Sequence, residues 1–183
     1  MAILADQLLE THTALSGAGI AHAFGGAIAL AYCTRDPRGT SDLDINVFIP
    51  AERCAEALAA LPPGIDQPPG VAELIARDGQ RRLWWGETPI DLFFNNVPVH
   101  EQAERHARQV SFAGATIPVL GPVELVVFKA MFDRTKDWAD IEAVVAAEAV
   151  DIGAVRSTLA ELIAPDDSRF ARLDEAVRRG RAQ

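Results

Sequence analysis

The sequence contains no apolar run as long as the roughly 18 residues that a membrane-spanning helix requires. Its first residues, MAILADQLLETH, include no basic stretch and no small-residue cleavage site, so we expect no signal peptide. The only cysteines are Cys33 and Cys54, which do not form the close pairs of a disulfide framework. These absences predict a cytoplasmic protein with reduced thiols and no membrane partner.

Basic residues are fewer than acidic ones, with 17 Lys and Arg against 26 Asp and Glu and a net charge of -9. Non-specific nucleic-acid binding depends on neutralising phosphates with Lys and Arg, so this charge argues against a broad nucleic-acid surface. It does not exclude a local basic groove. The short basic clusters are typical of solvated surface, and they are Arg35 and Arg38, Arg81 and Arg82, Arg105 and Arg108, and Arg134 and Lys136.

Two further catalytic patterns are absent. No Gly-x-Ser-x-Gly context surrounds a serine, so a serine nucleophile is unsupported. The four histidines, His12, His22, His100 and His106, have no metal-ligand spacing. We interpret them as ordinary surface or core residues, with His22 on the strand that leads toward the first glycine pair.

The 183 residues favour one domain, long enough to bury about 70% of the surface of the unfolded chain. Apolar periodicity predicts strands at 20–24 and 42–49, two short strands around Gly114 within 110–120, and a hairpin at 81–94 around Gly86-Glu87. Helices are expected at 3–16, 27–33, 51–61, 99–109, a long region from 122, 153–163 and 167–180, with a stiff Pro-Gly loop at 62–70 and a helical turn or strand at 71–77. This order predicts an α+β fold, a small mixed sheet flanked by helices, with a core at 1–120 and a helical region at 121–183 packed on it as one compact unit.

The stretch DLDINVFI places two carboxylates, Asp42 and Asp44, on one face of the expected strand, because side chains at i and i+2 share a face. Leu43 then points to the core. Like charges on one face repel unless a cation lies between them, and hard oxygen ligands without nearby His or Cys suit Mg²⁺ or Mn²⁺. Asp91, in the apolar run PIDLFF, is the candidate third ligand. Alternatively, the two acids form the solvent face of an edge strand.

The pair Gly25-Gly26 follows a predicted strand and precedes a predicted helix. Glycines let backbone N–H groups approach a phosphate closely, and a helix N-terminus favours negative charge. A phosphate-binding turn and a pair of metal-binding carboxylates on neighbouring elements together indicate a metal-dependent nucleotide enzyme. A tight turn with no ligand is the simpler alternative for the glycines alone.

The stretch GGAIALAYCTRDPRGTSDLDI resembles the signature of the DNA polymerase β-like nucleotidyltransferase superfamily, a Gly-Gly or Gly-Ser turn followed after a spacer by Asp-h-Asp-h. The form RGTSDLDI is similar to the branch of AbiEii-type nucleotidyltransferase toxins of type IV toxin–antitoxin systems. Many superfamily members have Ser after the first glycine, where this chain has Gly26. A hydroxyl contact to phosphate is then lost or supplied by Thr40 or Ser41.

A second block, FKAMFDRTKDWADI, is similar to the downstream Lys and Arg-x-Lys-Asp-x-x-Asp-h of that branch. In one continuous helix, Lys129, Asp133, Lys136 and Asp140 would share a stripe, which is also what a surface ladder of ion pairs would produce. A lysine among apolar neighbours has a partner more often than not, either an acid or a phosphate. Asp137 and Asp140 are candidates to orient Lys129 and Lys136.

The resemblance implies an enzyme that moves an NMP from an NTP to an acceptor hydroxyl and releases pyrophosphate. The implied catalytic residues are Asp42, Asp44, Asp91 and Lys129, and the three acids hold Mg²⁺ or Mn²⁺. The implied nucleotide-binding residues are Gly25, Gly26, Arg38, Thr40, Ser41 and Lys129. The toxin branch implies RNA such as a tRNA end as acceptor and a cognate antitoxin as partner.

Three alternatives remain open from the sequence. An antibiotic nucleotidyltransferase of the aminoglycoside or lincosamide type fits an acidic protein. AMPylation of a protein is another. The third is a non-catalytic domain that binds a nucleotide or a partner. The adjacent Trp84-Trp85 could stack on a base, but core packing is the more common use of such residues.

Overall fold

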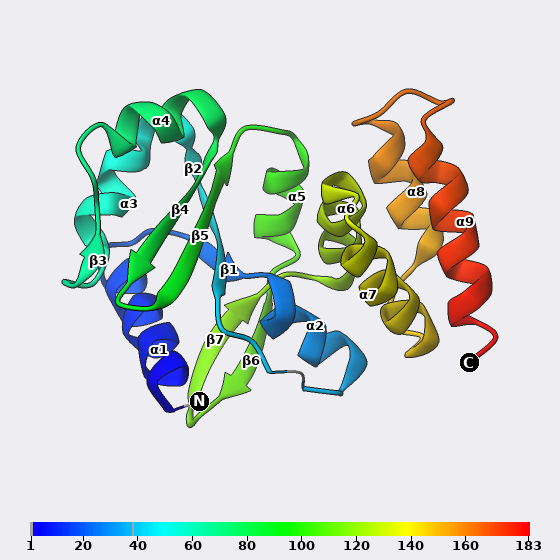
Figure 1. The fold of residues 1–183 in the computed structure, drawn as a ribbon, viewed down its shortest axis with the longest axis horizontal. Helices are drawn as coiled ribbons and strands as arrows, with labels where there is room; N and C mark the ends of the chain where they lie inside the picture. The colour runs from blue at the N-terminus through cyan, green and yellow to red at the C-terminus, as the bar shows by residue number, and fades with distance from the viewer. Residues whose placement is uncertain (1, 38) are drawn as a thin grey trace. The chain divides into compact units, whose positions relative to one another are not determined.

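The computed structural model describes residues 2–37 and 39–183 and divides them into two units (Figure 1). Unit 1 comprises residues 2–28 and 39–120 and contains the strands of the described chain. Unit 2 comprises residues 29–37 and 121–183 and is helical. The division falls within α2 (Gly26–Thr34). No helix among the described residues is both long enough and apolar enough to cross a membrane.

The strands of unit 1 form one mixed sheet of seven strands within the described residues, in the order β3-β4-β5-β2-β1-β7-β6. They are β1 (His22–Phe24), β2 (Leu43–Pro50), β3 (Ile65–Asp66), β4 (Gln80–Trp85), β5 (Thr88–Asn95), β6 (Arg108–Phe112) and β7 (Ala115–Val119). The pairs β2–β5 and β1–β7 are parallel, and the other neighbouring pairs are antiparallel. The strand β2 therefore lies in the middle of the sheet and not at its edge.

The core of unit 1 lies against one face of the sheet, and strand alternation explains which residues form it. Leu43, Ile45 and Val47 of β2 are fully buried, as are Ile90, Leu92 and Phe94 of β5. The residues between them face the other way and are mostly less buried. The prediction that alternate residues of DLDINVFI point into the core is confirmed.

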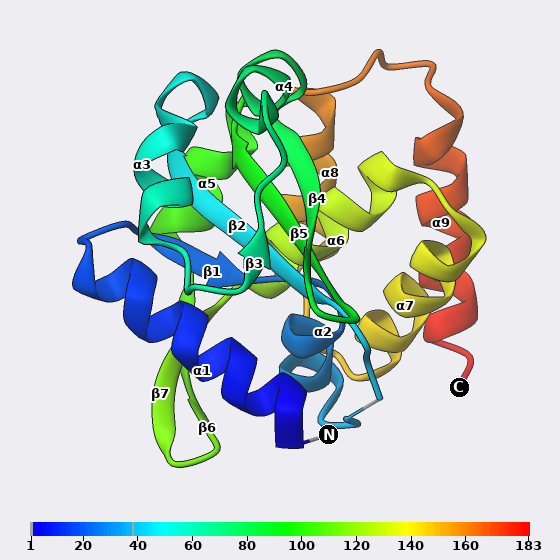
Figure 2. The ribbon, with the colours of Figure 1, turned by 60° about the vertical axis from the view of Figure 1, so that its left-hand side comes forward.

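Helices of different lengths and one 3₁₀ turn cover parts of this sheet (Figure 2). They are α1 (Ala2–Gly17), the 3₁₀ turn η1 (Ala51–Arg53), α3 (Cys54–Ala60), α4 (Val71–Asp78) and α5 (Val99–Arg105). The helix α4 lies between Gly70 and Gly79, both with positive φ, which are conformations that glycine adopts at little cost. It packs on β4, while α5 packs on β2 and β5.

Unit 2 contains α6 (Pro122–Phe132), α7 (Thr135–Ala146), α8 (Ile152–Ala160) and α9 (Ser168–Gly180). The helix α7 packs against both α6 and α9, and α6 packs against α8 (Figure 1). Gly180 permits the close approach of α9 to α7, because a Cβ there would lie 2.6 Å from the backbone oxygen of Glu142. Asp151 and Asp167 cap the N-termini of α8 and α9 by accepting hydrogen bonds from backbone N–H groups.

The predicted α+β class, with a mixed sheet, flanking helices and a helical C-terminal part, is confirmed. Three local expectations were wrong. The segment 62–70 contains the short strand β3, and the expected helix at 99–109 ends at Arg105 before β6 begins. The expected long helix from 122 ends at Phe132, because Asp133 adopts a left-handed φ of 58°. The ambiguous segment 71–77 is helical.

Candidate nucleotide and metal site

The candidate site is a row of charged residues on the face of the sheet opposite the core. In the pairing of β2 with β5, Asp44 is in register with Asp91. In the pairing of β5 with β4, Asp91 is in register with Arg82. Neighbouring strands lie about 5 Å apart, so the backbones of these three residues form one continuous row across three strands.

Asp42 adds a second carboxylate beside this row. It directly precedes β2 and is two residues from Asp44, so the two share a face. The hydroxyl of Thr40 donates to Oδ1 of Asp42 at 2.5 Å and thereby fixes this carboxylate. Both acids are partly exposed, although β2 is an interior strand. The edge-strand interpretation of these acids was therefore wrong.

The glycine turn lies directly against Asp44. The N–H of Gly25 donates to the backbone oxygen of Asp44 at 2.8 Å, which ties the end of β1 to β2. Gly26 begins α2 with φ of +48°, and a Cβ at this position would lie 1.8 Å from Oδ2 of Asp44. The absence of a side chain at Gly26 therefore makes room for the Asp44 carboxylate. It also explains why this chain cannot hold Ser at position 26 in the observed geometry.

Arg82 binds Asp91 through two parallel hydrogen bonds. Its Nε donates to Oδ1 at 2.8 Å and its Nη2 donates to Oδ2 at 2.6 Å. The Arg82 side chain is 50% exposed and that of Asp91 is 17% exposed. The pKa of Arg82 is raised, chiefly by the hydrogen bonds to Asp91 and further by the negative charges of Asp91, Asp42 and Asp44. Arg82 thus neutralises part of the acidic row.

The donor set of this row fits a divalent cation in type, since all three side chains offer hard oxygens. Asp42 and Asp44 fit by sharing a face, and Asp91 fits by its register with Asp44. Within the described part of the chain, however, no three His, Cys, Asp or Glu side chains already stand as a group that could hold a metal ion. Both oxygens of Asp91 accept hydrogen bonds from Arg82, so a cation shared by Asp91 and the other two acids would compete with the guanidinium charge for this carboxylate.

Lys129 belongs to unit 2, where its amino group lies next to two acids of α7. Its Nζ lies 2.7 Å from Oδ2 of Asp140 and 3.6 Å from Oδ1 of Asp137. Asp137 is almost fully buried and also accepts hydrogen bonds from Nε and Nη2 of Arg134. The side chain of Lys129 is only 9% exposed. Of the two partner types expected for this lysine, the structure provides acids.

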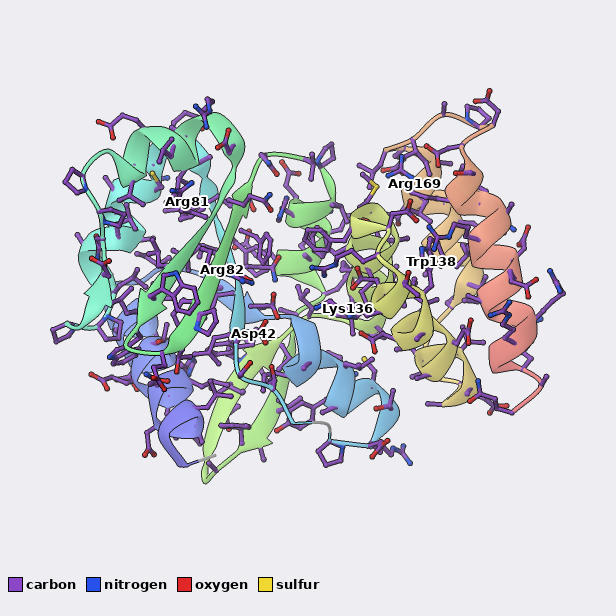
Figure 3. All side chains as sticks on the ribbon, viewed as in Figure 1. Asp42, Arg81, Arg82, Lys136, Trp138 and Arg169 are labelled. Carbon is purple, nitrogen blue, oxygen red and sulfur yellow. The ribbon has the colours of Figure 1, made fainter. Side chains whose placement is uncertain are left out.

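Among the described residues, the remaining candidates of the two motif blocks do not form part of either charged cluster described above. Lys136 is exposed on α7 (Figure 3), and Asp133 ends α6 instead of continuing a stripe with Lys129. Ser41 is exposed next to Asp42. Arg38, expected to bind the nucleotide, lies outside the described residues.

No family model matches the sequence, and no curated protein matches it. Among solved structures, the antibiotic-resistance factor ANT(2'')-Ia is similar with a TM-score of 0.62 at 13% identity, over 95% of this chain and 96% of that one. An antigenic nucleotidyltransferase-like protein from Paracoccidioides brasiliensis has a TM-score of 0.52 at 15% identity, over 94% and 91%. The chain has the nucleotidyltransferase fold. The closer resemblance to AbiEii-type toxins stays a prediction.

Within this nucleotidyltransferase fold, the sequence analysis missed the pairing of Arg82 with Asp91, and it gave base stacking only as the less common option for Trp84. The signal was present in the hairpin, because a two-residue turn at Gly86-Glu87 places Arg82 opposite Asp91. Trp84 lies two residues further along the same face and is 46% exposed, so core packing was the wrong interpretation for it. Trp84 is thus available as a stacking surface on the same face of the sheet as the acids.

The histidines were also expected to be scattered, but two of them meet. The ring nitrogens His12 Nδ1 and His22 Nε2 lie 3.0 Å apart, and His22 Nδ1 lies 2.9 Å from the backbone oxygen of Ile20. Burial lowers the pKa of both histidines. His22 can then donate to Ile20 and accept from His12, which requires only neutral rings. This pair joins α1 to β1, and no sequence spacing indicates it.

Proposed function

We propose that the protein is a metal-dependent nucleotidyltransferase that moves an NMP from an NTP to an acceptor hydroxyl. The observation that carries the proposal is the position of Asp44. It lies against the Gly25-Gly26 turn on one side and in register with Asp91 on the other. A place for phosphate and a place for a divalent cation therefore adjoin on a nucleotidyltransferase fold.

Each part of the site has a chemical task in this proposal. Asp42, Asp44 and Asp91 hold Mg²⁺ or Mn²⁺, which supplies charge neutralisation at the reacting phosphate when bound. The N-terminus of α2 after Gly25 offers N–H groups and a favourable dipole to the phosphates. Once it is free of Arg82, Asp91 helps to activate the acceptor hydroxyl, either as a metal ligand or as the base that accepts its proton. Thr40 keeps the carboxylate of Asp42 in place through its hydrogen bond.

The acceptor we favour is a hydroxyl of a small molecule, as in antibiotic modification. The net charge of -9 disfavours a large RNA surface, and the similar structure with the TM-score of 0.62 is that of an antibiotic-resistance factor. A tRNA or other RNA end is the second candidate, and the motif RGTSDLDI with its resemblance to the toxin branch supports it.

A labelling experiment distinguishes the acceptors. The protein is incubated with Mg²⁺ and each α-labelled NTP, together with either total tRNA or a panel of aminoglycosides and lincosamides. We expect the label in a small molecule. Label in the RNA band would identify the toxin-type activity instead, and label in neither, with all four NTPs, would contradict both assignments.

A further inference from the structure

The ion pair between Arg82 and Asp91 occupies the carboxylate that the proposed metal site needs. Both oxygens of Asp91 accept hydrogen bonds from the guanidinium, at 2.8 and 2.6 Å. A cation that used Asp91 together with Asp44 would compete with Arg82, because two positive charges held on one carboxylate repel each other, even though each oxygen keeps a second lone pair.

The pair is built so that it can open. Half of the Arg82 side chain is exposed, and β4 pairs with only the two-residue strand β3 on its outer side. Exposed ion pairs contribute about 0–1 kcal/mol, and the two-pronged geometry with the less exposed Asp91 places this pair at the upper end of that range, a cost that binding of a divalent cation can offset. Asp91 cannot swing away in the same manner, since it is 17% exposed and its strand lies between β4 and β2.

Arg81, which directly precedes Arg82, faces the other side of the sheet. It is in register with Leu92, a buried residue of the core face, whereas Arg82 is in register with Asp91. In the view of Figure 3, Arg82 lies nearer to Asp42 than Arg81 does. The two arginines form a matched pair for experiments, with one facing the acids and one facing away.

We propose that Arg82 is a displaceable counter-ion that holds Asp91 until a divalent cation takes its place, and that the released guanidinium then binds the triphosphate. This inference rests on the nucleotidyltransferase function proposed above. The planar guanidinium that now matches a carboxylate with two hydrogen bonds matches a phosphate in the same way. Arg82 therefore positions Asp91 in the free protein and contacts substrate in the loaded one.

This exchange makes metal and nucleotide binding depend on each other. Without nucleotide, the cation must compete with Arg82 for Asp91. With nucleotide, Arg82 gains phosphate as an alternative partner, and Asp91 is available at lower cost. Because such coupling is reciprocal, the cation should also raise the affinity for nucleotide, and both effects should be smaller without the guanidinium.

The test is the titration of Mn²⁺ into the full chain by calorimetry, first without nucleotide. Arg82→Gln should bind Mn²⁺ at least about fivefold more tightly than wild type, which is the release of roughly 1 kcal/mol of ion pairing. Arg81→Gln is the matched control and should bind as wild type does. Adding Asp91→Asn to Arg82→Gln should abolish the gain. Arg82→Lys, which keeps the charge but loses the two-pronged geometry, should lie in between and guards against a folding defect.

The second arm repeats the titration with a non-transferable α,β-methylene NTP analogue. Nucleotide should tighten Mn²⁺ binding in wild type and do so less in Arg82→Gln. Unchanged or weaker Mn²⁺ binding by Arg82→Gln, or a gain that survives Asp91→Asn, would overturn the proposal. If the protein transfers nucleotides but Arg82→Gln shows no gain in Mn²⁺ affinity, the proposed function stands and this inference is wrong. If Arg82→Gln shows the gain but the protein transfers to no acceptor, the exchange of Arg82 for a cation stands and the proposed function is wrong.

Discussion

At the scale of single residues, Gly26 shows how a missing side chain can define a site. Its left-handed φ and the 1.8 Å between a built Cβ and Oδ2 of Asp44 leave no room for another residue. The sequence identified Gly26 as a departure from the Ser of many related signatures. It could not show that the space is filled by a carboxylate, because that depends on the path of β2 relative to α2.

Replacing Gly26 by Ser therefore tests this geometry. We expect a loss of about 1–3 kcal/mol in the free energy of unfolding, since a non-glycine residue is strained at this φ and Asp44 must move. Gly17→Ala is the matched control, because a Cβ at Gly17 would meet no atom within 4 Å. Urea denaturation measures both. Equal stability of Gly26→Ser and wild type would show that the close contact with Asp44 is not present in solution.

His100 makes the stability depend on pH. It is 5% exposed, and burial lowers its pKa to about 4 from an ordinary 6.5, with a backbone hydrogen bond at Val97 acting in the opposite direction. Between pH 6.5 and 4 the unfolded chain binds a proton that the folded protein does not, so stability falls as the pH falls through this window. Lowering the pH from 7 to 4.5 should cost roughly 2 kcal/mol from this residue alone.

The measurement compares urea denaturation of wild type and His100→Gln at pH 7 and pH 4.5. Between pH 7 and pH 4.5, His100→Gln should lose roughly 2 kcal/mol less of its free energy of unfolding than wild type loses. His106→Gln, at an exposed site of the same residue type, is the control. An identical loss in wild type and His100→Gln would mean that His100 is not protected from protonation in the folded state.

At the scale of elements, the junction of α6 and α7 depends on buried charge. Lys129 of α6 meets Asp140 and Asp137 of α7, and Asp137 is bound in turn by Arg134. The left-handed residue Asp133 ends α6 and also accepts hydrogen bonds from Nε1 of Trp138 and Nη1 of Arg172. These contacts explain how two helices with a short connection are held at a defined angle within unit 2.

Lys129→Ala should lower the free energy of unfolding by about 3 kcal/mol, because it removes the buried cation that pairs with both Asp137 and Asp140. Lys136→Ala, at an exposed site on α7, should change it by less than about 0.5 kcal/mol. Kinetics with NTP, measured on the folded fraction, then separate a structural from a nucleotide-binding role. Full stability of Lys129→Ala would contradict the buried ion pairs.

The elements differ in how far the sequence could predict them. The hairpin of β4 and β5 follows from alternation and from Gly86-Glu87, and with it the register of Arg82 and Asp91. The break at Asp133 was missed because a non-glycine residue at a φ of 58° leaves no compositional mark. The strand β3 was missed because two residues pairing with Trp84 and Trp85 carry no periodicity of their own.

At the scale of the whole molecule, the order of elements predicted the α+β class, and the resemblance of the stretch from Gly25-Gly26 to Asp42-Leu43-Asp44 to a known signature implied the nucleotidyltransferase fold. The acids of β2 and β5 were predicted as one set, and the structure places Asp44 and Asp91 in register. The pairing of Arg82 with Asp91 follows from the hairpin, but its position beside Asp44 could not be predicted, since that requires knowing that β5 pairs with β2. A small set of motif residues thus indicates the fold, while the charge balance of the site depends on strand order.

The most direct test of the account is pyrophosphate release from NTP with Mg²⁺ and acceptor, measured for wild type and Asp44→Asn. We predict Mg²⁺-dependent release by wild type. The isosteric variant should be about a thousandfold slower, because it loses a charge at the reacting phosphate, and its melting temperature should be nearly unchanged. Equal rates in the two proteins, or no release by wild type with any NTP, would contradict the claim that the acids of β2 and β5 catalyse nucleotidyl transfer.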